Sequence, residues 1–223
     1  MSSLLRDAYL LSEWIKTNRA FGLGPNFREF EFLRKSHDGN GRHYHTFEHI
    51  AECIRFANTH YGDQPTLPIV KWALFYHDVI YDVKSTTNEE DSAARFEVFA
   101  LSRIKGEKLT SSMVFLSSAL IRSTASHRAE SASISTAMMI DTDLHILGAE
   151  RSRYLRYARD VWLEYSSVGE EAYRQGRLAF LDSINPFDLF HTDAGRALIP
   201  QVIENIAMEK TLLESRNPNF LTL

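Results

Sequence analysis

Apolar residues along this chain recur at steps of three and four, which is the spacing of one face of an amphipathic α-helix. The strict alternation of apolar and polar positions that is typical of strands is hard to find. Glycine and proline are scarce, with 10 and 6 copies in 223 residues, so few positions interrupt the helical pattern. The pattern therefore predicts an all-α protein of about ten helices.

Short segments rich in glycine, proline and polar residues separate these helices. No repeat, low-complexity tract or interior linker divides the chain, so we expect one domain over residues 1–223. Its core covers about residues 40–185, with flanking helices in 1–36 and 190–216. The predicted helices cover approximately residues 4–19, 27–35, 46–60, 69–81, 87–102, 110–123, 136–147, 150–166, 170–181 and 194–214.

The composition is that of an ordinary globular protein, with 44% hydrophobic and 24% charged residues. The net charge of -4 provides no basic field for nucleic acid or a membrane surface. The single cysteine, Cys53, excludes a disulfide framework and a multi-cysteine zinc site. The N-terminal apolar stretch is interrupted by charged residues, and no run is long enough to span a membrane. We therefore expect a cytoplasmic protein, and the aromatic content is compatible with a homodimer.

Histidine and aspartate supply the candidate chemistry. His45 and His49 lie four residues apart in RHYHTFEHI, so on a helix they share one face, and both can point into one cavity. The pair His77-Asp78 lies in the apolar segment WALFYHDVIYD, where a buried carboxylate needs an ion pair, a hydrogen bond or a metal. An internal His–Asp hydrogen bond, or pairing of the aspartate with an arginine, is the alternative to a metal site.

Two other pairs contain aspartate. His37-Asp38 lies in the loop segment HDGNG, and we interpret it as a solvated pair that arises by chance. Asp141 and Asp143 lie in the apolar segment MMIDTDLHILG. Residues two apart on a helix point about 200° apart. We therefore expect at most one of these two carboxylates to face the core and the other to be a surface or capping residue.

The ordered set His49, His77-Asp78 and Asp143 resembles the H…HD…D signature of the HD superfamily of metal-dependent phosphohydrolases. The segments RHYHTFEHI, FYHDVIYD, NEEDSA, IRSTASH, IDTDLHILG and YRQGRLAFL together resemble a subgroup of predicted HD phosphohydrolases, over about residues 40–185. This resemblance implies a single HD-type helical domain whose metal ligands are His49, His77, Asp78 and Asp143.

Two finer assignments follow from the same resemblance. The family places its last carboxylate just before a hydrophobic residue near the helix end, which favours Asp143 over Asp141. YHTFEH is similar to the YHNxxH segment of cyclic-nucleotide phosphodiesterases, in which the first histidine is the proton donor and the second a metal ligand. This implies that His45 is the donor and His49 the ligand, although Thr46 here replaces the asparagine.

These residue types suit the hydrolysis of phosphate esters. Imidazole and carboxylate ligands fit a divalent Mn, Fe, Co, Ni, Zn or Mg ion, one or two per chain. Such an ion lowers the pKa of bound water, so hydroxide attacks phosphorus, and Asp78 can orient or deprotonate that water. His45 can protonate the leaving alkoxide because the ordinary pKa of histidine lies near neutrality. We therefore expect metal-dependent hydrolysis of a small phosphate ester, such as a nucleotide.

Three further residues are candidates at the same site. His127, after IRSTAS, is a candidate second-metal ligand or phosphate contact, with an ordinary loop histidine as the alternative. Thr86-x-x-Glu89 and Thr87-x-x-Glu90 both fit a capping box, and Glu89 either caps the helix or reaches the metal-bound water. Arg42 precedes the histidine cluster and either binds phosphate or lies on the surface.

Two other functions stay open on the sequence alone. A few HD-fold proteins hold two irons and use oxygen, which requires extra histidines, and His127 is the best candidate for such a ligand. The second is a non-catalytic helical domain that retains a structural metal and binds a nucleotide or a partner. The complete ligand set, with His45 left over for a leaving group, favours the hydrolase.

Overall fold

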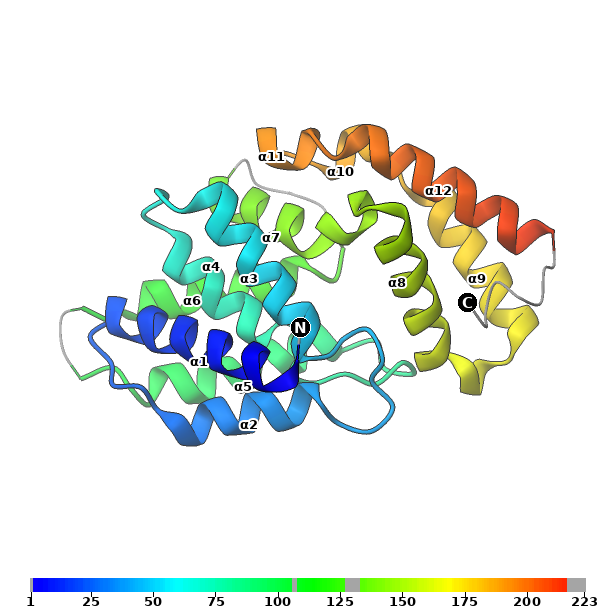
Figure 1. Ribbon diagram of the computed structural model, residues 1–223. Coiled ribbons are helices and arrows are strands. Elements are labelled where there is room, and N and C mark those ends of the chain that lie inside the picture. The colour runs from blue at the N-terminus through cyan, green and yellow to red at the C-terminus, as the bar shows by residue number, and fades with distance from the viewer. Residues whose placement is uncertain (1, 106–107, 127–132, 216–223) are drawn as a thin grey trace.

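Twelve α-helices and two short 3₁₀-helices make up the regular structure of the computed structural model, which describes residues 2–105, 108–126 and 133–215 (Figure 1). No β-strand occurs within these ranges, which confirms the predicted all-α fold. The helices are α1 (Ser3–Ala20), α2 (Phe27–His37), α3 (Phe47–Tyr61), α4 (Leu67–Tyr76), α5 (Asn88–Leu101), α6 (Ser111–Ser123), α7 (Ile134–Leu144), η1 (His145–Gly148), α8 (Arg151–Glu164), η2 (Ser166–Val168), α9 (Glu170–Ser183), α10 (Pro186–Leu189), α11 (Asp193–Arg196) and α12 (Ile199–Glu214).

Helix α4 is the central helix of the first half of the molecule. Pro68 lies in its first turn, where a missing backbone N–H costs no helical hydrogen bond. Every other residue of α4 is buried, because α1, α3, α6 and α7 pack around it. A helix that is apolar on all sides is stable only in such a surrounded position. The candidate residues that follow α4 therefore extend from a helix that is surrounded by others.

The predicted helix over residues 69–81 extends too far, since α4 ends at Tyr76. The guanidinium of Arg42 donates to the carbonyl of Asp78 at 2.6 Å and to that of Val79 at 3.2 Å. These carbonyls are satisfied without a further helical turn, so the chain can leave the helix here. The His-Asp pair consequently lies at the end of a helix and not within one.

Helices α8, α9 and α12 form the other side of the molecule (Figure 1), where α12 packs on α8, α9 and η1, and α8 also packs on η1. Their core contains a buried ion pair, in which Arg177 Nε lies 2.8 Å from Glu209 Oε1. The hydroxyl of Tyr154 donates to the same carboxylate. Helix α7 contributes side chains to the hydrophobic clusters of both sides, so it connects them.

The interpretation of His37-Asp38 as a solvated chance pair is wrong. His37 is the last residue of α2, is fully buried, and lies with Nδ1 2.9 Å from the carbonyl of Leu33. Asp38 accepts a hydrogen bond from the Arg6 guanidinium at 2.6 Å. Helix α2 extends two residues beyond its predicted end, so the pair belongs to a packed helix terminus.

The other predicted helices agree with the structure to within a few residues, except near the C-terminus. The predicted helix over residues 194–214 is divided into α11 and α12, and the four-residue helix α10 was not predicted. Across the part of the chain that the structure describes, no helix is both long and apolar enough to cross a bilayer.

Candidate metal centre

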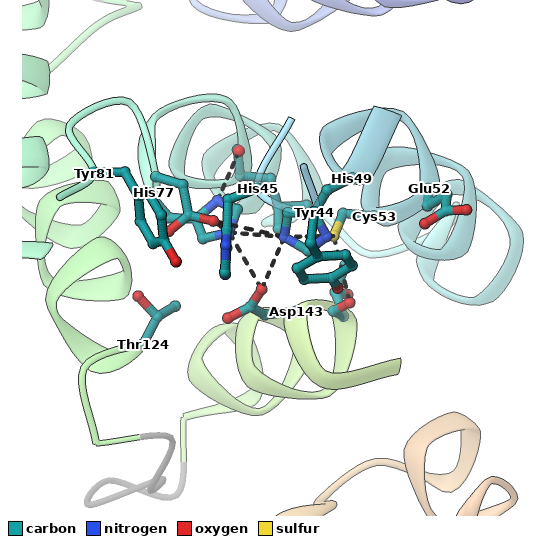
Figure 2. A network of polar contacts seen from close by, with 12 residues as sticks. Tyr44, His45, His49, Glu52, Cys53, His77, Tyr81, Thr124 and Asp143 are labelled. Atoms are coloured by element: carbon teal, nitrogen blue, oxygen red, sulfur yellow. Dashed lines mark hydrogen bonds and ion pairs between the residues drawn. The ribbon is translucent and has the colours of Figure 1, made fainter. Parts of the chain in front are cut away.

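Four side chains from three helices meet between α3, α4 and α7 (Figure 2). We refer to them as the ligand group, which consists of His49 in α3, His77 and Asp78 at the end of α4, and Asp143 in α7. Nε2 of His77 lies 3.0 Å from Oδ2 of Asp78 and 3.2 Å from Oδ1 of Asp143. Nε2 of His49 lies 3.2 Å from the same Asp143 oxygen and 3.2 Å from Nε2 of His77. The structure thus brings together all four predicted metal ligands.

The spacing of these donor atoms fits a single cation. Nitrogen and oxygen ligands lie about 2.0–2.2 Å from an ion such as zinc, which places neighbouring ligand atoms roughly 3–3.5 Å apart. Five of the six pairs in the ligand group, all except Asp78 with Asp143, have donor atoms between 3.0 Å and 3.7 Å apart, and the longest of these separations joins His49 Nε2 to Asp78 Oδ2. Both histidine side chains are 1% exposed, and those of Asp78 and Asp143 are 13% and 11% exposed. An ion held there would be nearly enclosed.

The electrostatics of the ligand group also favour a cation. Burial alone lowers the pKa of His77, but Asp78 and Asp143 outweigh burial and raise this pKa well above its ordinary value. Burial alone raises the pKa of Asp78, but the adjacent His77 imidazole outweighs burial and lowers it. Two buried carboxylates therefore attract positive charge, which either a proton on His77 or a divalent ion can supply.

A hydrogen bond to the backbone of its own helix orients the ring of His77. Its Nδ1 lies 3.0 Å from the carbonyl of Leu74, which can only accept, so Nδ1 carries the hydrogen. In the neutral imidazole this leaves a lone pair on Nε2, directed at the other donor atoms. A backbone carbonyl that fixes the tautomer in this way is a common feature of metal-bound histidines.

The NEEDSA segment fastens the chain that follows the His-Asp pair. The side chain of Asn88 accepts from the N–H of Asp82 at 3.0 Å and donates to the carbonyl of the same residue at 2.9 Å. The hydroxyl of Ser92 accepts from the N–H of Ile80 at 3.1 Å. These contacts close the loop between α4 and α5 and thereby hold the end of α4 in place.

The structure gives a different outcome for each of the three further candidates, Arg42, Glu89 and His127. Arg42 directs its guanidinium at three backbone carbonyls, which favours a structural role over the predicted phosphate contact. Glu89 lies in the first turn of α5. Thr87, the start of the second predicted capping box, is the N-cap residue, but its side chain makes no capping hydrogen bond, so neither capping box is formed. A role for Glu89 at the metal stays a prediction. His127 lies outside the described residues, and its role also stays a prediction.

His45 lies just before α3 and is held by a carboxylate from α8. Glu164, the last residue of α8, accepts from Nδ1 of His45 at 2.6 Å and from the hydroxyl of Tyr81 at 3.0 Å. Its other oxygen accepts three consecutive backbone N–H groups, those of residues 43–45, at 2.8–2.9 Å. The His45 ring packs on Tyr81, with 4.3 Å between ring centroids, and lies beside the ligand group (Figure 2).

Sequence reasoning missed Glu164, which lies 119 residues after His45. Its only distinguishing signal is an acidic residue between the apolar residues Leu163 and Tyr165. Burial raises the pKa of Glu164, but His45 outweighs burial and lowers it to about 2. Burial lowers the pKa of His45, but the hydrogen bond to Glu164 outweighs burial and raises it. The two residues form a charge-assisted pair in which His45 retains its proton to a higher pH than a free histidine does.

Asp141 has a separate structural role. It is fully buried and accepts from the N–H of His191 at 3.0 Å and from both the N–H and the hydroxyl of Thr192 at 2.7 Å. The expectation that only one of the two α7 carboxylates faces the interior is wrong, because α7 is covered by protein on more than one side. Asp141 holds the chain at the start of α11, and Asp143 is the one that joins the histidines.

Cys53 contacts the ligand group from one turn further along α3. Its sulfur is fully buried, 3.7 Å from Nδ1 and 3.8 Å from Nε2 of His49, and 3.6 Å from the carbonyl of Thr142. Donor atoms of His49, Cys53 and Asp143 all lie within 4.8 Å of one another. Burial raises the pKa of the Cys53 thiol well above its ordinary value. The sequence indicated that this cysteine forms neither a disulfide framework nor a multi-cysteine zinc site, but did not place it beside His49.

No protein-family model, curated protein or solved structure matches this chain. The class of the protein is therefore defined by its own fold and site. It is an all-α protein with buried histidine, aspartate and cysteine side chains that could hold a metal ion.

Proposed function

We propose that this protein is a metal-dependent phosphohydrolase that acts on a small phosphate ester, such as a nucleotide. The observation that supports this most strongly is the position of His45 beside the ligand group, with Glu164 behind it. A purely structural metal site does not need an ionisable histidine that stays protonated beside it. A cation together with a proton donor is what the hydrolysis of an ester with a poor leaving group requires.

The ligand group fits Mn, Fe, Co, Ni or Zn, because imidazole and carboxylate together suit these ions better than they suit Ca. When bound, a divalent ion supplies positive charge for the phosphoryl oxygens and a hydroxide nucleophile near neutral pH. Asp78 keeps the role predicted for it, which is to orient or deprotonate the attacking water.

His45 would protonate the leaving oxygen through Nε2. Its Nδ1–H is committed to Glu164, so Nε2 is the ring nitrogen left to face a substrate. The side chain is 22% exposed, which leaves room for a substrate oxygen to approach it. Glu164 stabilises the protonated imidazole, and this is the form that a general acid must have at the start of the reaction.

The test is a hydrolysis panel with metal-loaded protein. The full chain is stripped of metal, reloaded with Mn²⁺, Co²⁺ or Mg²⁺, and assayed on phosphomonoesters and phosphodiesters. We expect turnover of at least one ester and its loss in His77→Ala and Asp78→Ala. The control His60→Ala, which changes an exposed histidine that stacks on Phe56, should retain activity.

Two results would contradict the proposal. One is equal turnover by the wild type and the ligand-group variants, and the other is no turnover of any ester by protein shown to contain the metal. Two irons per chain with an oxygen-dependent reaction would support the di-iron alternative instead.

A further inference from the structure

We propose that the chain has a second, thiophilic metal position, formed by Cys53, His49 and Asp143, whose occupation excludes an ion from the ligand group. This proposal rests on the proposed function in so far as the two positions share His49 and Asp143. The second position would bind Zn²⁺ or Co²⁺ through sulfur, nitrogen and oxygen.

The three donor groups lie close enough together for one ion with mixed ligands, once the His49 ring turns about its Cβ–Cγ bond. His49 and Cys53 lie four residues apart on α3 and therefore share a face, and Asp143 faces them from α7. With zinc–sulfur and zinc–nitrogen bonds of about 2.3 and 2.0–2.1 Å, sulfur and nitrogen ligands lie roughly 3.5–3.7 Å apart. The Cys53 sulfur lies 3.7 and 3.8 Å from the two nitrogens of His49, and Nε2 of His49 lies 3.2 Å from Asp143 Oδ1.

The sulfur position is distinct from that of the ligand group. Because Sγ is almost equally far from both nitrogens of His49, it lies off the direction of the Nε2 lone pair, which faces His77. Binding at the sulfur therefore requires the His49 ring to turn about its Cβ–Cγ bond and away from His77. His49 cannot serve both positions at once, so one ion excludes the other.

Buried polar atoms next to these residues point independently to a ligand. Thr142 is fully buried, its carbonyl lies 3.6 Å from the Cys53 sulfur, and its hydroxyl has no hydrogen-bond partner in the described structure. Tyr44, whose ring centroid lies 4.8 Å from that of His49, also has a buried hydroxyl without a partner there. Buried polar atoms are rarely left unpaired, so these two hydroxyls, which belong to residues that contact Cys53 and His49, are compatible with a ligand bound nearby.

The ligand types determine which ions each position prefers. A thiolate selects softer ions such as Zn²⁺, whereas carboxylate and imidazole without sulfur also accept Mn²⁺ and Mg²⁺. Binding at Cys53 breaks the S–H bond, forms the sulfur–metal bond and releases the proton to solvent. We therefore expect Zn²⁺ at the sulfur position to abolish Mn²⁺-dependent activity, because it draws His49 and Asp143 away from the ligand group.

The experiment is a titration of metal-free, reduced protein with Co²⁺, followed by absorption spectroscopy. Thiolate-bound Co²⁺ has an intense charge-transfer band in the near ultraviolet, which imidazole and carboxylate ligands do not produce. We expect this band in the wild type and in His77→Ala, which keeps all three residues of the sulfur position. Cys53→Ser should lose the band, retain the weak visible Co²⁺ bands, and bind Zn²⁺ more weakly, with Mn²⁺ affinity unchanged.

Each outcome decides the question. Visible Co²⁺ bands without the charge-transfer band in the wild type would overturn this proposal and leave the proposed function standing. A charge-transfer band that persists in Cys53→Ser would also overturn it, because the chain has no other cysteine. No Co²⁺ binding at all would overturn both proposals. Ile54→Val, which removes a methylene from the same buried turn, should keep the band, and the wild-type spectrum decides even if Cys53→Ser does not fold.

Discussion

Replacing Glu164 with glutamine changes the partner of His45 and leaves the ligand group in place. In the wild type, one Glu164 oxygen accepts three backbone N–H groups, and the other accepts from His45 and Tyr81. Glutamine has the same size and one carbonyl oxygen, so it can keep the three backbone bonds. It then presents an N–H₂ group to His45, which stabilises the neutral ring with its lone pair on Nδ1.

The size of the effect follows from the bond that is lost. A hydrogen bond to a charged partner contributes about 1.5–3 kcal/mol. At about 1.36 kcal/mol for each factor of ten, this reduces the protonated fraction of His45 by roughly 10–150-fold at a pH above its pKa. For an alkyl phosphate, kcat/KM should fall by the same factor in Glu164→Gln. His45→Ala removes the general acid itself and should cost about 10²–10⁴.

The assay compares two leaving groups across pH. A nitrophenolate leaves without a proton, so hydrolysis of a nitrophenyl phosphate should change little in Glu164→Gln, whereas hydrolysis of an alkyl phosphate should fall. The raised pKa of His45 keeps the general acid protonated, and activity is lost as pH rises through that pKa. Glu164→Gln lowers this pKa, so the alkaline limb of the alkyl-phosphate profile should move to lower pH.

Tyr81→Phe is the matched control, because it removes another hydrogen bond to the same Glu164 oxygen without changing the charge of that carboxylate. It should show little dependence on the leaving group. An equal loss for both leaving groups in Glu164→Gln, with an unmoved alkaline limb, would refute the assignment of His45 as the proton donor.

Three further predictions concern stability. Loading the ligand group with Mn²⁺ at 100 times its dissociation constant should stabilise the fold by about 2.7 kcal/mol; calorimetry with and without a chelator would measure this, and an unchanged melting temperature would contradict it. Gly195→Ala should destabilise by about 1–3 kcal/mol, since the added Cβ would overlap Oδ2 of Asp141, and denaturant unfolding should detect the loss. Arg177→Met should cost about 3–5 kcal/mol because it leaves Glu209 charged and buried, and Arg177→Met/Glu209→Leu should recover most of that loss if the ion pair is the cause.

Most helices of this protein, and the residue types of its site, could be predicted from the sequence. Helical periodicity and breaking residues are local signals, so they predicted all the long helices and most of their ends. The convergence of His49, His77, Asp78 and Asp143 was predicted from the resemblance of their order to a family signature, and not from their spacing alone. Local signals did not predict where α4 ends, and the carbonyls just beyond that end are bound by Arg42, which comes from another part of the chain.

The tertiary structure alone decided which groups face one another. Glu164 reaches His45 across 119 residues, and Cys53 reaches Thr142 across 89, so no local pattern relates them. Asp141 and Asp143 have the same residue type and nearly the same sequence context. Their different roles arise because α7 packs against α11 on one side and against α3 and α4 on another. Periodicity along a chain determines which face of a helix is apolar, but only packing determines what each face meets.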